Sequence, residues 1–223
     1  LPEMPIHVMI EPTSVCNLRC PMCFQSDPTF RVRGLMGMMD LNLFQSVIDQ
    51  ADEGGTGALT MGSRGEPFLH PKFSDMLALA SEKRSFFEIK INTNATRLDE
   101  AACHSLLSSK ATLINLSIDS HKAEIYEKIR VRGRLEQVLA NVKRLSYIRQ
   151  HHYPRSSVEL RVSGVKVSKE QVEEEFSLFW LEFVDNVAYV KMQERWDTYN
   201  NQLRPDRHKV PCEFLWDRLQ IWF

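Results

Sequence analysis

The chain has 223 residues, of which 43% are hydrophobic and 26% are charged, and its formal net charge is −1. This composition is ordinary for a soluble globular protein, and the length suits one large α/β domain with a sizeable core. The balanced charge gives no electrostatic basis for a nucleic acid or an anionic membrane as partner. No apolar run reaches the roughly eighteen residues of a spanning helix, and residues 1–5 do not form a signal peptide, so we expect a cytoplasmic protein.

Strand-like and helix-like patterns alternate along the chain. Apolar alternation predicts strands over residues 7–11, 58–61, 87–92, 112–119, 158–163 and 187–192. Helical periodicity predicts one helix capped by Asp40 and others over 72–83, 99–108, 123–129, 135–149 and 169–180. This alternation implies parallel strands with right-handed crossovers. Six such units are too few for an eight-stranded barrel and suit an open sheet or an incomplete, six-stranded barrel.

The two faces of the predicted strands differ in polarity. One face is apolar and should pack against the helices, because side chains alternate across a strand; it carries Val8, Ile10, Ile89, Ile91, Ile114, Leu116, Ile118, Val158, Leu160 and Val162. The other face carries Glu11, Glu88, Lys90, Asn92, Asn115, Ser117, Asp119, Glu159, Arg161 and Ser163. A sheet with one solvated face would show the same pattern, but helices normally cover both faces of parallel sheets. We therefore favour a hollow barrel lined by polar side chains.

Three cysteines, Cys16, Cys20 and Cys23, follow the first predicted strand at CxxxCxxC spacing. Three thiolates on one loop can hold three irons of a [4Fe–4S] cube and leave the fourth iron open to another ligand. A zinc site would need a fourth ligand from Cys103, Cys212 or a distant histidine. Inert buried thiols are a further alternative, whereas five cysteines without a secretory signal argue against disulfides.

A glycine-containing segment, Gly62-Ser63-Arg64-Gly65-Glu66-Pro67, follows the second predicted strand, at the end where parallel α/β folds place their sites. Glycine lets the backbone approach a ligand closely, and the Glu66 carboxylate suits an ammonium group. A Gly-Glu-Pro tripeptide alone is most often a turn. Its position after the second strand of a protein with a cysteine loop favours a ligand site.

The cysteine loop and Gly65-Glu66-Pro67 together resemble the radical S-adenosylmethionine (SAM) enzymes, and the resemblance covers nearly the whole chain. It implies an α/β fold, a partial (β/α)6 TIM-like barrel. It also implies that SAM binds the open iron of a [4Fe–4S] cluster and that one electron cleaves it to methionine and a 5′-deoxyadenosyl radical, which takes hydrogen from a substrate. Cys16, Cys20 and Cys23 match the cluster ligands, and Gly65 and Glu66 match the segment that binds the SAM amino group.

Five further positions match family segments near SAM. Met22 stands where the family usually has an aromatic residue beside the adenine, and a thioether can still pack on a ring. Asn94, Ser117 and Asp119 resemble residues that help to hold SAM, although all three types are also ordinary helix N-caps. Arg130 matches an arginine near the SAM carboxylate, with a solvated helix-end arginine as the alternative.

The C-terminal segment resembles the opening of the auxiliary-cluster region called SPASM or twitch, in which a first cysteine precedes an apolar strand. The resemblance implies a core barrel over 1–195, then a linker and the incomplete start of that region over 196–223. Cys212 is then a candidate auxiliary-cluster ligand, with a buried thiol as the alternative. Glu194, Arg195 and Trp196 follow the sixth predicted strand, at the rim where a substrate would enter.

Two hypotheses of function follow. The first is a radical SAM enzyme that takes hydrogen from a peptide or another small molecule such as a sugar, with an electron donor such as flavodoxin or ferredoxin as partner. Oxidation, epimerisation and cross-linking are all compatible with it. The second is a non-catalytic zinc or iron–sulfur module that binds a partner protein, in which the Gly-Glu-Pro and Ser-Ile-Asp segments serve as turns and caps.

Overall fold

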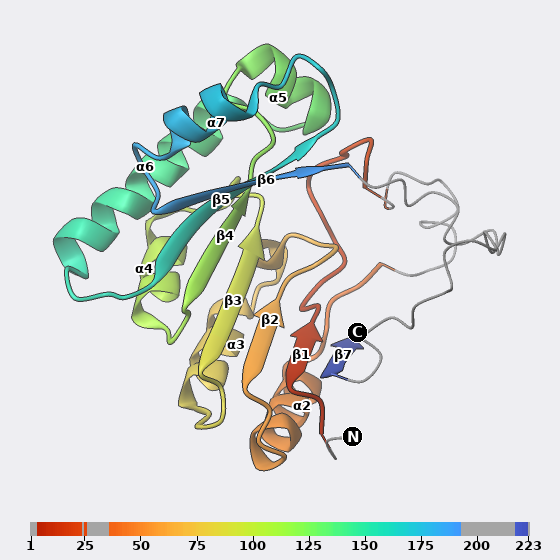
Figure 1. The fold of residues 1–223 in the computed structure, drawn as a ribbon. Coiled ribbons are helices and arrows are strands. Elements are labelled where there is room, and N and C mark those ends of the chain that lie inside the picture. The colour runs from red at the N-terminus through yellow and green to blue at the C-terminus, as the bar shows by residue number, and fades with distance from the viewer. Residues whose placement is uncertain (1–3, 24, 26–35, 193–216, 223) are drawn as a thin grey trace, which may run out of the picture.

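The computed structural model describes residues 4–23, 25, 36–192 and 217–222. Within them, seven strands form one parallel sheet in the order β6-β5-β4-β3-β2-β1-β7 (Figure 1). The strands are β1 (His7–Ile10), β2 (Ala58–Met61), β3 (Glu88–Thr93), β4 (Leu113–Ser117), β5 (Glu159–Lys166), β6 (Asn186–Lys191) and β7 (Arg218–Ile221). Among these strands the sheet is not closed, so the predicted incomplete α/β barrel is confirmed.

Six α-helices and one short 3₁₀ helix lie in the described part of the chain and connect the strands. The α-helices are α2 (Leu41–Glu53), α3 (Phe73–Glu82), α4 (Glu100–Ser108), α5 (Ala123–Ile129), α6 (Leu135–His152) and α7 (Glu173–Trp180), and the 3₁₀ helix η2 covers Pro67–Leu69. The Asp40 side chain accepts a hydrogen bond from the backbone N–H of Asn42 at 2.8 Å, as its predicted capping role requires. Such a cap stabilises a helix by about 1 kcal/mol.

The strand β7 adds a seventh member to the six predicted strands. It pairs in parallel with β1, with His7 opposite Arg218 and Ile10 opposite Ile221. The family resemblance places this stretch at the start of the C-terminal region, over residues 196–223. In the structure, that strand is part of the same sheet as the core.

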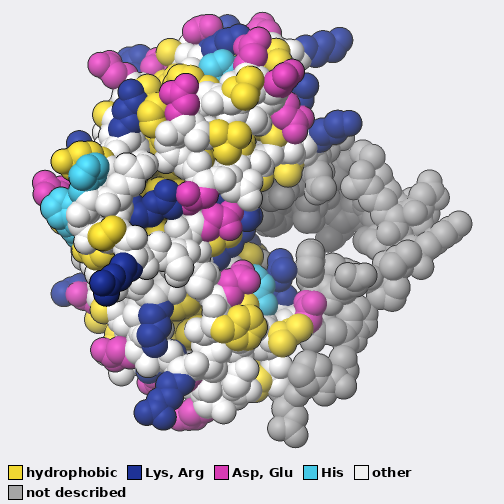
Figure 2. Space-filling model, turned by 60° about the vertical axis from the view of Figure 1, so that its left-hand side comes forward, with side chains coloured by type: hydrophobic (Ala, Val, Ile, Leu, Met, Phe, Trp, Pro, Cys, Tyr) yellow, Lys and Arg dark blue, Asp and Glu magenta, His cyan; other side chains and the backbone are white. Residues whose placement is uncertain are grey.

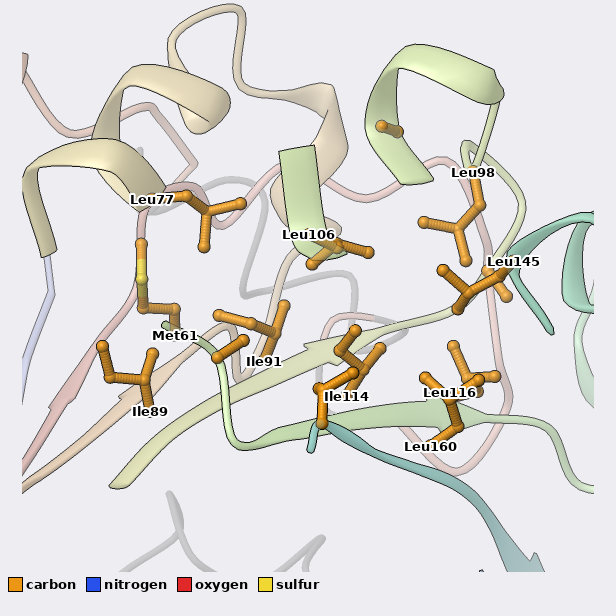
Figure 3. Close-up of a cluster of buried hydrophobic side chains, with 14 of the residues drawn as sticks. Met61, Leu77, Ile89, Ile91, Leu98, Leu106, Ile114, Leu116, Leu145 and Leu160 are labelled. Atoms are coloured by element: carbon orange, nitrogen blue, oxygen red, sulfur yellow. The ribbon is translucent and has the colours of Figure 1, made fainter. Parts of the chain in front are cut away.

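The hydrophobic core lies between the sheet and its outer helices. Side chains such as Ile91, Ile114 and Leu160 leave the strands on one face and meet Leu106 of α4 and Leu145 of α6 (Figure 3). Each of these five side chains has no measurable exposure. The predicted assignment of the apolar face to the helices is therefore correct, and the polar side chains are left on the concave face of the sheet.

The concave face carries paired polar side chains. The amide of Asn115 donates a hydrogen bond to the Ser163 hydroxyl at 3.0 Å, across the β4–β5 ladder. Arg161 and Glu159 form an ion pair at 2.9 Å between Nη2 and Oε1. The two charges offset each other on this face, as partly buried charges require.

The outer surface mixes both signs of charge. On the face shown in Figure 2, lysine and arginine side chains alternate with aspartate and glutamate, in keeping with the net charge of −1. Within the described ranges, none of the helices combines the length and the apolar character needed to span a membrane.

Candidate functional site

All three cysteines of the loop line one cavity at the carboxyl ends of the strands. The cavity has a volume of about 520 Å³, within the range of about 300–1,000 Å³ typical of small-molecule and cofactor sites. Besides Cys16, Cys20 and Cys23, its lining comprises Met22, Gly62, Ser63, Arg64, Gly65, Glu66, Asn92, Thr93, Asn94, Ser117, Arg130, Val165, Val190, Lys191 and Met192. Of the predicted site residues within the described part of the chain, all except Asp119 lie in this lining.

The cysteine loop is fixed to neighbouring segments by side-chain amides. Nε2 of Gln25 donates to the carbonyl oxygens of Ser14 and Arg64, at 2.6 and 2.8 Å. Asn17 donates to the Thr96 hydroxyl at 2.8 Å. Gln25 is buried, so these bonds satisfy a polar group that would otherwise lose its hydration. The loop that carries the thiols is therefore held on two sides.

Gly65 is required by the close approach of two backbone segments. The backbone N–H of Glu66 donates to the carbonyl oxygen of Val15 at 2.9 Å. A Cβ atom at position 65 would lie 2.8 Å from that oxygen and closer still to the carbonyl oxygen of Thr13. The segment after β2 thus packs directly on the segment that leads into the cysteine loop. A residue with a side chain at position 65 would force the two segments apart.

The Glu66 carboxylate is buried and hydrogen-bonded by the protein itself. Its Oε1 accepts from the Thr93 hydroxyl at 2.7 Å, and its Oε2 accepts from the backbone N–H of Asn94 at 2.7 Å. Burial raises the pKa of Glu66 to about 7, against the opposing effect of these hydrogen bonds. Glu66 therefore both lines the cavity and ties the segment after β2 to the end of β3.

Glu11 is a second buried carboxylate beside this segment, which the sequence analysis placed only on the polar face. Its Oε1 accepts from the backbone N–H of Arg64 at 2.9 Å, and its Oε2 faces Nε of Arg64 at 3.7 Å. Burial raises the pKa of Glu11 to about 7. The guanidinium of Arg64 also lies over the Trp222 ring, with 2.9 Å from its central carbon to the ring centroid. The strand β7 is thus linked to the cavity lining through Arg64.

Asn94 lies next to the first cysteine. Its amide Nδ2 is 3.7 Å from Sγ of Cys16 and donates to Oδ1 of Asn17 at 3.1 Å. Its Oδ1 accepts from the Thr96 backbone N–H at 3.0 Å and so closes a local turn. The alternative role as a helix N-cap does not apply, because Asp99 caps the helix that follows.

Arg130 and Asp119 form a buried ion pair. Nε of Arg130 donates to Oδ2 of Asp119 at 2.5 Å, and Nη2 donates to Oδ1 at 3.2 Å. The Arg130 side chain is only 13% exposed, so the solvated helix-end alternative is wrong. Asp119 is fully buried and absent from the cavity lining, with its carboxylate directed at Arg130. The structure thus brings Arg130 to the cavity and places Asp119 behind it.

The donor set on the cavity wall fits an iron–sulfur cluster. Sulfur ligands favour iron–sulfur clusters, zinc and copper(I), and a four-iron cube is wider than one ion, with one thiolate on each protein-bound iron. Burial raises the pKa of Cys20 to about 11, so a bound cation is needed to hold it as thiolate. Among the described residues, no three histidine, cysteine, aspartate or glutamate side chains converge on a single metal ion. Cys103 is buried in the hydrophobic core.

Several residues of the lining escaped the sequence analysis. Val165 belongs to β5, while Val190, Lys191 and Met192 end or follow β6. The rule that parallel strands present their carboxyl ends to one site points to the ends of β5 and β6, but it does not say that β6 lies beside β5 in the sheet. Cys212, Glu194, Arg195 and Trp196 lie outside the described residues.

Comparison with known proteins identifies the family. The model of the radical SAM superfamily matches residues 10–178, which is most of the chain. The chain belongs to the radical SAM superfamily. It is 33% identical over 114 residues to a tungsten-containing aldehyde ferredoxin oxidoreductase cofactor-modifying protein of Pyrococcus furiosus, covering 51% of this chain and 30% of that protein. It is 28% identical over 146 residues to the Bacillus subtilis antilisterial bacteriocin subtilosin biosynthesis protein AlbA, covering 64% and 31%.

Solved radical SAM structures share the fold. Streptococcus suis SuiB bound to S-adenosylmethionine superposes with a TM-score of 0.67 at 19% identity, covering 86% of this chain and 41% of SuiB. SuiB bound to its precursor peptide SuiA gives a TM-score of 0.68 at 20% identity, covering 86% and 40%. The predicted partial barrel of the radical SAM type is thereby confirmed. The chain spans about a third of the length of the two curated relatives named above.

Proposed function

We propose that the chain forms the catalytic core of an enzyme that cleaves SAM reductively and abstracts hydrogen from a substrate. The observation that carries this proposal is that the cysteine loop and the Gly65–Glu66 segment line one cavity. Cys16, Cys20 and Cys23 would hold a [4Fe–4S] cluster, which would supply the electron for splitting SAM into methionine and a 5′-deoxyadenosyl radical. Flavodoxin or ferredoxin is the proposed source of that electron, and the cytoplasm is the proposed compartment.

The chain's own residues position SAM in this proposal. Glu66 orients the SAM amino group, since a carboxylate forms a charge-assisted hydrogen bond with an ammonium. Met22 packs on the adenine, and Ser117 and Asn94 offer polar contacts from the ends of β4 and β3. Arg130 lies in the same lining, where its guanidinium favours the SAM carboxylate. Together these groups fix the reacting bond and exclude water from it.

The proposed substrate is a peptide, with a sugar-like small molecule as the alternative. AlbA is named for bacteriocin biosynthesis, and SuiB has been solved with a precursor peptide, so peptide modification recurs among proteins similar to this chain. The polar concave face, with Asn115, Ser163 and Arg161, offers hydrogen-bonding groups of the kind that a peptide backbone needs. The net reaction stays open among oxidation, epimerisation and cross-linking, and an auxiliary cluster involving Cys212 stays part of the proposal.

Anaerobic reconstitution with iron and sulfide tests the function. We expect about four irons per chain on the three cysteines, and release of 5′-deoxyadenosine when SAM and dithionite are added. Cys20→Ala should lose both, whereas Cys103→Ala, which changes a core thiol, should keep both. One tightly bound zinc with no iron would contradict the proposal and favour the non-catalytic module.

A further inference from the structure

Arg130 lies between a buried carboxylate and a cysteine sulfur. Its Nε and Nη2 donate to Asp119, while Nη1 lies 3.9 Å from Sγ of Cys20. The guanidinium therefore turns one edge toward the carboxylate and a third nitrogen toward the thiol. At 3.9 Å the contact with sulfur is a long hydrogen bond, so the charge of the guanidinium matters more than the bond itself.

The orientation of this guanidinium is fixed because Asp119, its partner, is itself held by neighbouring residues. Oδ1 of Asp119 also accepts from the backbone N–H of Val165 at 2.9 Å, and the Asp119 carbonyl oxygen accepts from the Gln171 amide at 2.8 Å. Asp119 and Gln171 are both buried. At the other end, the backbone N–H of Arg130 donates to the carbonyl oxygen of Tyr126 at 2.6 Å and ends α5. An arginine held at both ends loses little further entropy when it faces a ligand.

The Arg130 side chain stays charged in this setting. An arginine side chain keeps its proton in proteins, and the buried Asp119 carboxylate pairs with the positive charge of Arg130. By contrast, Cys16 faces a neutral donor, the Asn94 amide at 3.7 Å. Two of the three thiols thus have unlike neighbours, one cationic and one neutral.

A fixed cation beside a cluster ligand has a definite electrostatic effect. Reduction of an iron–sulfur cluster adds one negative charge, so a nearby positive charge stabilises the reduced form more than the oxidised form. Net charge and hydrogen bonds to the sulfurs are among the factors that set cluster potentials. The effect is large where water is excluded, and Cys20 is only 8% exposed.

We propose that Arg130, oriented by Asp119, is a positioning residue for Cys20 that raises the reduction potential of the cluster. This inference rests on the proposed function, since it requires a cluster on Cys20. It assigns Arg130 a role that acts before SAM binds, distinct from a contact with the SAM carboxylate. The ion pair with Asp119 then keeps the cation beside Cys20 whether or not SAM is present.

A redox titration of the reconstituted full chain without SAM, followed by electron paramagnetic resonance, tests the proposal. Arg130→Gln should shift the midpoint potential to a more negative value, and Arg130→Lys should restore part of the shift. The double variant Arg130→Gln with Asp119→Asn leaves no unpaired buried carboxylate, and it should fold and still show the negative shift. Arg149→Gln is the matched control, because Arg149 also pairs with an aspartate, Asp185, but lies outside the cavity lining.

The outcomes separate the two proposals. A wild-type chain that takes up no iron overturns the proposed function. Cluster-loaded Arg130 variants with the wild-type potential overturn the role of Arg130 alone, including the case in which only their SAM affinity falls. A shift of equal size in Arg149→Gln also overturns it, because the shift would then not depend on proximity to Cys20.

Discussion

The backbone N–H of Asn94 donates a 2.7 Å hydrogen bond to Oε2 of Glu66, and this bond joins the ends of two neighbouring strands. This bond holds the segment after β2 next to the segment after β3, beside the cysteine loop. The side chain of Asn94 lies beside Cys16, with Nδ2 3.7 Å from Sγ. A change at Glu66 should therefore affect both the cavity lining and the loop that carries the thiols.

Glu66→Gln tests this double role. The amide of glutamine can accept at only one of the two positions where Thr93 and Asn94 donate, so one buried donor loses its partner. We expect the free energy of unfolding to fall by about 1–3 kcal/mol and SAM affinity to weaken, while the cluster is retained. Urea unfolding and calorimetric titration with SAM measure the two effects. Glu82→Gln, at an exposed helix end, should change neither.

Glu11 should make stability depend on pH. Its folded pKa of about 7 lies above the ordinary value of 4.5, so the folded chain binds more protons than the unfolded chain between these values. The stability that protonated Glu11 contributes is complete below about pH 4.5 and is lost as the pH rises through about 7. In urea unfolding of the cluster-free chain, Glu11→Gln should lose less stability than wild type between pH 5 and pH 8, by about 3 kcal/mol at most. Equal losses in both proteins would contradict the burial of this charge.

Gly65→Ala should separate the segment after β2 from the cysteine loop. Its methyl group would collide with the backbone carbonyl oxygens of Thr13 and Val15, which cannot rotate away as a side chain can. Gly55→Ala is the matched control, because position 55 has φ of +74° and no atom within 4 Å of an added Cβ. In the control, the free energy of unfolding should fall only by the roughly 1–2 kcal/mol that a left-handed backbone conformation costs a residue with a side chain. In Gly65→Ala, the free energy of unfolding should fall further than in the control, and less iron should be retained after reconstitution. Equal iron contents in the two variants would argue against the packing described.

Substitutions at Leu160 and Ser117 should affect different properties, the first stability and the second activity. Leu160 is fully buried under the helices, whereas Ser117 on the neighbouring strand lines the cavity. Leu160→Ala should lower the free energy of unfolding by about 2–5 kcal/mol, the usual cost of truncating a packed leucine. Ser117→Ala should unfold like wild type and release less 5′-deoxyadenosine. The opposite pattern would mean that the side chains on β4 and β5 face the other way.

The sheet was largely predictable because the apolar alternation that marks each strand can be seen within that strand's own sequence. Alternation at Ile114 and Leu116, and again at Leu160 and Val162, specifies which face is buried without reference to any other strand. The parallel order then follows from the crossover helices. The residues Lys191 and Met192 were overlooked because their place in the lining depends on where β6 lies beside β5, which no local pattern encodes.

The residues of the site were easier to predict than the hydrogen bonds and ion pairs that those residues form with one another. Asp119 and Arg130 were both assigned to SAM from the family resemblance, but the sequence does not say that the two side chains satisfy each other. Glu66 likewise carries the predicted carboxylate, yet its bonds to Thr93 and Asn94 arise only when β2 and β3 are brought together. Residue type predicted the chemistry, and tertiary packing decided which atoms meet.

The pairing of β1 with β7 sets an order for assembly. β1 leads directly into the cysteine loop, but its partner β7 follows all the other described strands in the sequence. Among the described strands, β1 can therefore pair only with β2 until β7 has been synthesised, and its other edge offers unpaired N–H and C=O groups until then. The strand that leads into the cysteine loop thus gains its second neighbour last, and before that an aggregation-prone strand edge lies beside the three oxidation-sensitive thiols.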